Sequence, residues 1–148
     1  MKPRILISLQ TQYWQLIVEA KKDYEYRRIF RNDAVTAFVY ATAPVNAVVG
    51  VVEFDVPIIA SIAEICGIVE RQSPGSTQRM MEYMKGLDKA YAVPILSYQV
   101  LGAPVPIQEI RRQVHDFHPP QSYLILANHP ALHALLQERR SGSGGKNF

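Results

Sequence analysis

Short strand-like segments follow one another through the first third of the chain, and only one helix-like segment interrupts them. Several of these segments alternate in character with a period of two, which is typical of strands. Turn signals at Asn32, Asp33 and Pro44 separate the later ones. Strands are therefore expected at residues 4–9, 23–31, 35–42 and 47–54.

Helical periodicity accounts for much of the remaining chain. At the first helix Thr11 is a plausible N-cap, and at the second Ser61 and Glu64 have the spacing of a capping box. Pro130 suits the first turn of the last helix. Helices are expected at residues 11–21, 61–71, 77–87 and 107–114, and from residue 130 onward.

The second half of the chain also returns to strand character. Residues 91–101 and 123–126 are expected as strands, and residues 102–106 as a turn. This mixed order favours an α+β fold with a largely antiparallel or barrel-like sheet over a doubly wound fold. We expect one domain over residues 1–140, followed by a flexible Gly- and Ser-rich tail over residues 141–148.

The composition excludes several classes of protein. No uninterrupted apolar run approaches the roughly 20 residues of a membrane span, and the N-terminus does not resemble a secretory signal. The 148 residues carry 16 basic and 13 acidic side chains, a net charge of +3. This balance permits nucleic-acid binding without requiring it. We expect a cytoplasmic protein that binds no membrane.

The cysteine and histidine content argues against disulfides and metals. The single cysteine, Cys66, excludes an internal disulfide and lies on the apolar stripe of its expected helix. His115 and His118, with Asp116 between them, are possible metal ligands, and His129 and His133 are four residues apart. Pro130 places His129 near the N-cap, however, and no acidic or cysteine partner is evident. We expect no metal and no cofactor.

The densest polar cluster spans residues 21–28, at a helix-to-strand junction. Strand geometry places Glu25 and Arg27 on one face, with Lys22 just before the strand. That face is either ordinary charged surface or the wall of a cleft. Because the other face carries Tyr24 and Tyr26, it is the one expected to face the core.

Residues 20–27, with Lys22, Glu25 and Arg27, resemble the G-x-K-x-x-E-x-R motif of ASCH domains, which are PUA-like domains. The segments 5–9 with the following Tyr13, 39–45, 48–50, 82–86, 90–93 and 119–123 also resemble family segments in order and spacing. One departure is Ala20, which stands in place of the motif's glycine. The resemblance covers roughly residues 4–126.

The resemblance implies a mixed, mostly antiparallel β-barrel with flanking helices, and a cleft that binds RNA or a modified nucleoside. Lys22, Glu25 and Arg27 would line this cleft, and Ser8 and Thr42 lie on strands near the matched segments. Basic groups with interleaved tyrosines suit single-stranded RNA. The expected nucleic-acid contacts are Lys21, Lys22, Arg27, Arg28 and Arg31. The other basic doublets, Arg111–Arg112 and Arg139–Arg140, are expected to be solvated surface.

Two alternatives to a binding domain remain open. The first is an enzyme that uses the same cleft residues, and the second is a protein-interaction module that uses other segments. Some relatives hydrolyse the amide of N4-acetylcytidine with the motif lysine and others are ribonucleases, so Lys22 and Glu25 would be catalytic in an enzyme. An attacking lysine must be neutral, however, and Glu25 favours its charged form where the amide-hydrolysing members have a threonine. A protein-interaction module, with residues 61–87 and 129–140 as its surface, is the second alternative.

Overall fold

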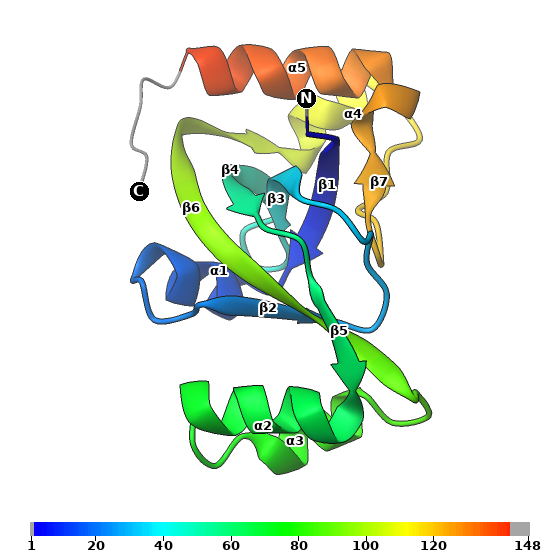
Figure 1. The fold of residues 1–148 in the computed structure, drawn as a ribbon. Coiled ribbons are helices and arrows are strands. Elements are labelled where there is room, and N and C mark those ends of the chain that lie inside the picture. Colours follow the sequence, from blue (N-terminus) through cyan, green and yellow to red (C-terminus); the bar gives the residue numbers. More distant parts are fainter. Residues whose placement is uncertain (1, 143–148) are drawn as a thin grey trace.

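The computed structural model describes residues 2–142, which form a mixed seven-stranded sheet curled into a half-barrel with helices around it (Figure 1). The strands are β1 Arg4–Leu9, β2 Tyr24–Arg27, β3 Val35–Ala41, β4 Ala47–Phe54, β5 Ile58–Ser61, β6 Lys89–Pro106 and β7 Leu124–Ile125. The helices are α1 Thr11–Val18, α2 Ile62–Gln72, α3 Thr77–Tyr83, α4 Ile107–Gln113, α5 Pro130–Ser141 and the 3₁₀ turn Leu126–Asn128.

The strand order is β2-β6-β4-β3-β1-β7, with β5 paired to β6. Only the β1–β3 pairing is parallel among the pairs of the described chain, and the others are antiparallel. This arrangement confirms the expected α+β fold with a mostly antiparallel, barrel-like sheet.

The long strand β6 joins two parts of the molecule. Its second half pairs with β4, and its first residues pair with β2 on one side and β5 on the other. Figure 1 shows β6 winding from the half-barrel down to an arm, which we define as β5, α2, α3 and the start of β6 (residues 58–92). The turn expected over residues 102–106 is wrong, because Val105 and Pro106 continue β6 by pairing with Val48 and Ala47.

Both faces of the central strand β3 are buried, which separates two cores. On one side α1 covers the sheet with Trp14 and Ile17, and on the other α4 and α5 cover it. The arm has its own small core around Ile65, Val69 and Met84. The expected inner face of α5 is confirmed by the buried side chains of Leu132, Leu135 and Leu136.

Several expected boundaries need correction. Helix α1 ends at Val18, and its N-cap is Gln10; the Thr11 hydroxyl instead donates to the Thr42 carbonyl at 2.8 Å. Strand β2 stops at Arg27, and α3 stops at Tyr83. By contrast, the capping box of Ser61 is present at the start of α2, and Cys66 is buried on that helix.

Ser141, the first residue of the expected tail, belongs to α5. The rest of that prediction, residues 143–148, lies outside the described residues. Within residues 2–142, no helix has the length and apolar character needed to cross a bilayer.

Candidate functional site

Strand β2 lies between the half-barrel and the arm, so both of its faces are packed. Tyr24 and Tyr26 are half-buried against the arm core, whereas Glu25 and Arg27 are only 6% and 7% exposed. The expectation that the tyrosine face is the main core face is therefore wrong. The sequence pattern does not reveal that α2 and α3 fold back over the tyrosines.

The turn after α1 positions Lys22. Helix α1 ends at Val18, Ala20 follows in the left-handed region at φ 58°, and the Lys21 amide donates to the Leu16 carbonyl at 2.8 Å. This reversal leads the chain through Lys22 and Asp23 into β2, which begins at the next residue. The glycine of the ASCH motif fits this position, because glycine adopts positive φ without strain.

The Lys22 ammonium group lies between two aromatic rings and a carboxylate. Its Nζ is 5.2 Å from the Tyr13 ring centre and 5.1 Å from that of Tyr26. Glu25 Oε1 is 3.6 Å from the same atom, and the lysine side chain is 13% exposed. A cation held over aromatic faces and next to a carboxylate is fixed in place while keeping a small exposed area.

The Arg27 guanidinium ties together three segments of the chain. Its Nη1 donates to Glu25 Oε2 at 3.2 Å and to the Ser8 carbonyl at 3.3 Å, and its Nη2 donates to the Ser122 carbonyl. The Ser8 hydroxyl in turn donates to the Pro120 carbonyl at 2.8 Å. Arg27 thus positions the other site groups, and the extended segment around Pro120 forms one edge of the site.

The structure brings Lys22, Glu25, Arg27 and Ser8 together, but not the other predicted residues. Thr42 lies at the N-terminus of α1, in a shallow hollow with Thr11. The remaining basic residues are outside this cluster. Lys21 is an exposed partner of Glu19, Arg31 pairs with Asp33, and Arg28 binds the carbonyls of Tyr83 and Lys85.

Three further residues around this cluster were not predicted as site residues from the sequence. Tyr13 holds Lys22, Ser122 accepts from Arg27, and Tyr83 at the end of α3 lies within the electrostatic influence of Arg27 and Glu25. Tyr13 follows the first strand in a segment already matched to the family, so that signal was present. Tyr83 and Ser122 also lie in matched segments, 82–86 and 119–123, but the position of Tyr83 relative to β2 depends on how the arm folds.

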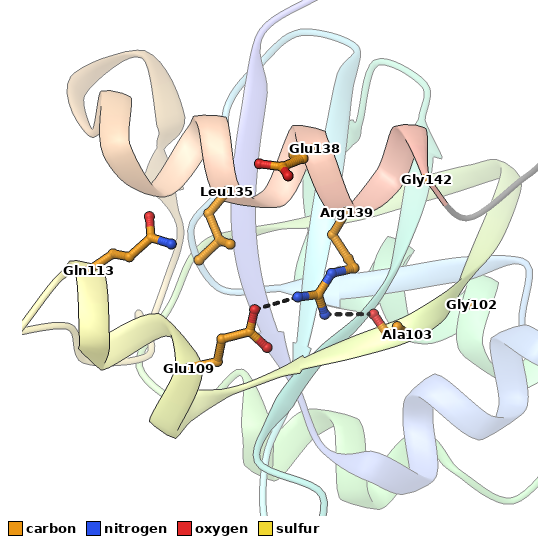
Figure 2. A pocket seen from close by; sticks show the side chains of 8 residues that line it. All are labelled: Gly102, Ala103, Glu109, Gln113, Leu135, Glu138, Arg139 and Gly142. Carbon is orange, nitrogen blue, oxygen red and sulfur yellow. Dashed lines mark hydrogen bonds and ion pairs between the residues drawn. The ribbon is translucent and has the colours of Figure 1, made fainter.

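A second hollow lies between α4, α5 and the end of β6, where Figure 2 shows Arg139 next to Glu109 and Ala103. Arg139 pairs with Glu109 and donates to the Ala103 and Pro104 carbonyls. Arg140 donates to Gln99 at 2.9 Å. These arginines therefore brace α5 against the sheet, which corrects the expectation that they are solvated surface.

Among residues 2–142, no three His, Cys, Asp or Glu side chains gather closely enough to bind an ion. The candidates near His115 and His133 therefore form no such cluster.

Known proteins resemble this chain in sequence and fold, although no protein-family model matches it. Over 119 residues it is 29% identical to a Zymomonas mobilis protein named ASCH domain-containing ribonuclease, covering 79% of this chain and 80% of the relative. The crystal structure of ASCH from Zymomonas mobilis aligns with a TM-score of 0.75 at 26% identity, over 90% of this chain and 95% of that one. A serine-to-alanine mutant of the Zymomonas mobilis protein aligns with a TM-score of 0.80 at 24% identity, over 93% and 96% of the two chains.

A half-barrel of mixed strands, with a lysine, a carboxylate and an arginine gathered at β2, defines a PUA-like α+β domain. Within that class, the chain is similar in sequence to an ASCH domain protein and in fold to ASCH crystal structures, and both similarities support the ASCH domain family. The resemblance seen in the sequence is thereby confirmed.

Proposed function

We propose that this protein binds single-stranded RNA or a modified nucleoside at the Lys22–Glu25–Arg27 site. The observation that carries the proposal is the fixed Lys22 ammonium, held by Tyr13, Tyr26 and Glu25 with a small area left exposed. A positioned cation beside aromatic rings is the combination that binds phosphate and base together in single-stranded RNA.

The charge balance of the site supports an anionic ligand. Two cations, Lys22 and Arg27, share a single carboxylate, so the cluster keeps one net positive charge. Arg27 is committed to holding Ser8 and Ser122, which leaves Lys22 as the group that contacts the ligand. The name of the Zymomonas mobilis relative, a ribonuclease, points to RNA as the class of ligand.

The same geometry favours binding over attack by the lysine. Glu25 Oε1 lies 3.6 Å from Lys22 Nζ, and a nearby carboxylate stabilises the charged amine. A charged amine is not a nucleophile. An amidohydrolase that uses Lys22 is therefore the weaker reading of this site.

A ribonuclease is the second candidate function, and the named relative is the observation that favours it. In this reading Glu25 accepts the proton of the ribose 2′-hydroxyl as its oxygen bonds to the phosphorus, and Lys22 stabilises the negative charge that develops on the phosphate. The bond from phosphorus to the 5′-oxygen then breaks, and that oxygen leaves as a hydroxyl after taking a proton from water. Glu25 must then leave one of its two ion pairs when substrate binds, since it is only 6% exposed.

The test is a binding titration with a fluorescent oligouridine at two salt concentrations. Lys22→Ala is expected to weaken binding about tenfold or more, since it removes a charge-assisted contact. The matched control Lys21→Ala, one residue away and exposed, is expected to change affinity much less. Affinity should fall as salt rises, because phosphate contacts release counterions. Equal effects of the two lysines would contradict the proposal.

The same samples distinguish binding from catalysis. Oligouridine is followed for cleavage on a gel, and N4-acetylcytidine for conversion to cytidine. Cleavage that disappears in both Lys22→Ala and Glu25→Gln would establish the ribonuclease reading. Conversion of N4-acetylcytidine that requires Lys22 would overturn the argument that this amine stays charged.

A further inference from the structure

Helix α3 reaches the functional site from the arm, and its last residue is Tyr83. None of the α3 residues is buried, and Tyr83 itself is 45% exposed. Burial is the largest influence on the pKa of Tyr83 and raises it, while the charges of Arg27, Glu25 and Arg28 act on the same phenol. Through its carbonyl, Tyr83 contacts Arg28, the residue that follows Arg27 of the site cluster, and much of the Tyr83 side chain is open to solvent.

Two neighbouring interactions hold Tyr83 in this position. Arg28 Nη1, which projects from the residue after β2, donates to the Tyr83 carbonyl at 2.7 Å and to the Lys85 carbonyl at 3.2 Å. The next residue, Met84, buries its side chain in the arm core and is 1% exposed. The backbone at Tyr83 is therefore anchored next to β2 before any ligand arrives, which limits the positions open to the ring and reduces the entropy lost on binding.

We infer that Tyr83 is the residue on which a ligand's nucleobase stacks, and that Arg28 is the positioning residue that holds it beside the Lys22 site. This inference rests on the proposed function, since it names the part of the ligand that the arm recognises. Lys22 binds the charged or carbonyl part of the ligand, and the exposed Tyr83 ring provides the flat surface for its base. Stacking on an aromatic ring contributes to the binding free energy for every type of base.

The experiment compares an oligouridine with an abasic chain of the same length, which has the same ribose–phosphate backbone. Tyr83→Ala is expected to weaken oligouridine binding about tenfold and to leave binding of the abasic chain unchanged. Tyr83→Phe is expected to keep most of the affinity, since the ring remains. The control is Met81→Ala, on the same helix and 56% exposed, which is expected to change neither affinity.

The role of Arg28 is tested by a double-mutant cycle. A positioning role predicts that Arg28→Ala weakens oligouridine but not abasic binding, and adds little to Tyr83→Ala. A direct phosphate contact would weaken both ligands equally and would be additive with Tyr83→Ala. That result would overturn the assignment of Arg28.

The outcomes separate this inference from the proposed function. If Lys22→Ala weakens oligouridine binding but Tyr83→Ala does not, the stacking role fails and the RNA site stands. If the unaltered protein binds neither oligouridine nor the abasic chain, both fail. Equal losses on the two ligands in Tyr83→Ala would also overturn the stacking role, because only one of them has a base. Thermal unfolding of each variant checks that the arm remains folded.

Discussion

The Glu25 carboxylate lies 3.2 Å from the Arg27 guanidinium, and each side chain is less than a tenth exposed. Such a pair is poorly solvated, so each charge depends on the other. Arg27 also satisfies the carbonyls of Ser8 and Ser122, which belong to distant parts of the chain. The arginine of the ASCH motif therefore stabilises the fold as well as the site.

Arg27→Ala is expected to lower the free energy of unfolding by about 2–4 kcal/mol, since it leaves Glu25 buried with one fewer partner and two carbonyls without their donor. Urea denaturation measures the loss. The control is Arg31→Ala, whose pair with Asp33 is more exposed and is expected to contribute at most about 1 kcal/mol. A similar small loss in both variants would contradict the structural role of Arg27.

Ala20→Gly is expected to stabilise the protein by about 0.5–1 kcal/mol. Ala20 has a φ of 58°, where an alanine is strained and a glycine is not, although glycine loses more entropy on folding. The same change at Ala134, within α5, should instead destabilise by about 1 kcal/mol. Thermal denaturation measures the change in stability of each variant. Changes of the same sign in both variants would contradict the left-handed turn at Ala20.

Gly50→Ala is expected to destabilise the protein by about 1–3 kcal/mol through overpacking. A Cβ at Gly50 would lie 2.2 Å from the Trp14 ring and 2.6 Å from the Gln99 carbonyl oxygen. Gly67, within α2, has its nearest neighbour at 3.6 Å, so Gly67→Ala is expected to stabilise by about 1 kcal/mol. Urea denaturation measures both, and a Gly50→Ala protein as stable as the parent would show that Trp14 can move away.

Glu53 gives the stability a dependence on acid pH. Burial by itself would raise the pKa of Glu53, but hydrogen bonds from Lys2 and Thr36 and the charge of Arg140 outweigh it and leave the pKa below its usual 4.5. A lowered pKa contributes stability that is present above pH 4.5 and is lost as the pH falls through the folded-state value.

Glu53→Gln is therefore expected to destabilise the protein at pH 7 and to have a smaller effect near pH 3. Unfolding free energies at the two pH values measure this difference. The matched variant Glu82→Gln, at an exposed position of α3, controls for the loss of one negative charge. An effect of Glu53→Gln that does not shrink in acid would contradict the lowered pKa.

Local sequence signals predicted the elements whose stabilising contacts are local. The strand expected at residues 47–54 matches β4, and the capping box of Ser61 and Glu64 is formed as expected. The grouping of Lys22, Glu25 and Arg27 also followed from strand periodicity. Each of these depends on residues within a few positions of one another.

The errors concern contacts between distant segments. Residues 102–106 contain the turn-like residues Gly102 and Pro104, yet pairing with β4 keeps the segment in β6. Periodicity indicated one packed face of β2, that of Tyr24 and Tyr26. The arm helices do cover these tyrosines, but the opposite face is buried more deeply against the half-barrel. Arg139 and Arg140 looked solvated for the same reason, because their partners lie at least 30 residues away.

The register of β5 against β6 has a consequence for how this domain can diversify. Ser61 pairs with Lys89, so the excursion through α2 and α3 leaves and re-enters the sheet at neighbouring positions. Segments whose ends lie side by side tolerate insertion, deletion and replacement without disturbing the rest of a domain. The half-barrel and the Lys22 cluster can therefore stay constant while α3 varies in length and sequence. Ligand preference can then evolve in a part of the chain whose ends are already joined by a strand pairing.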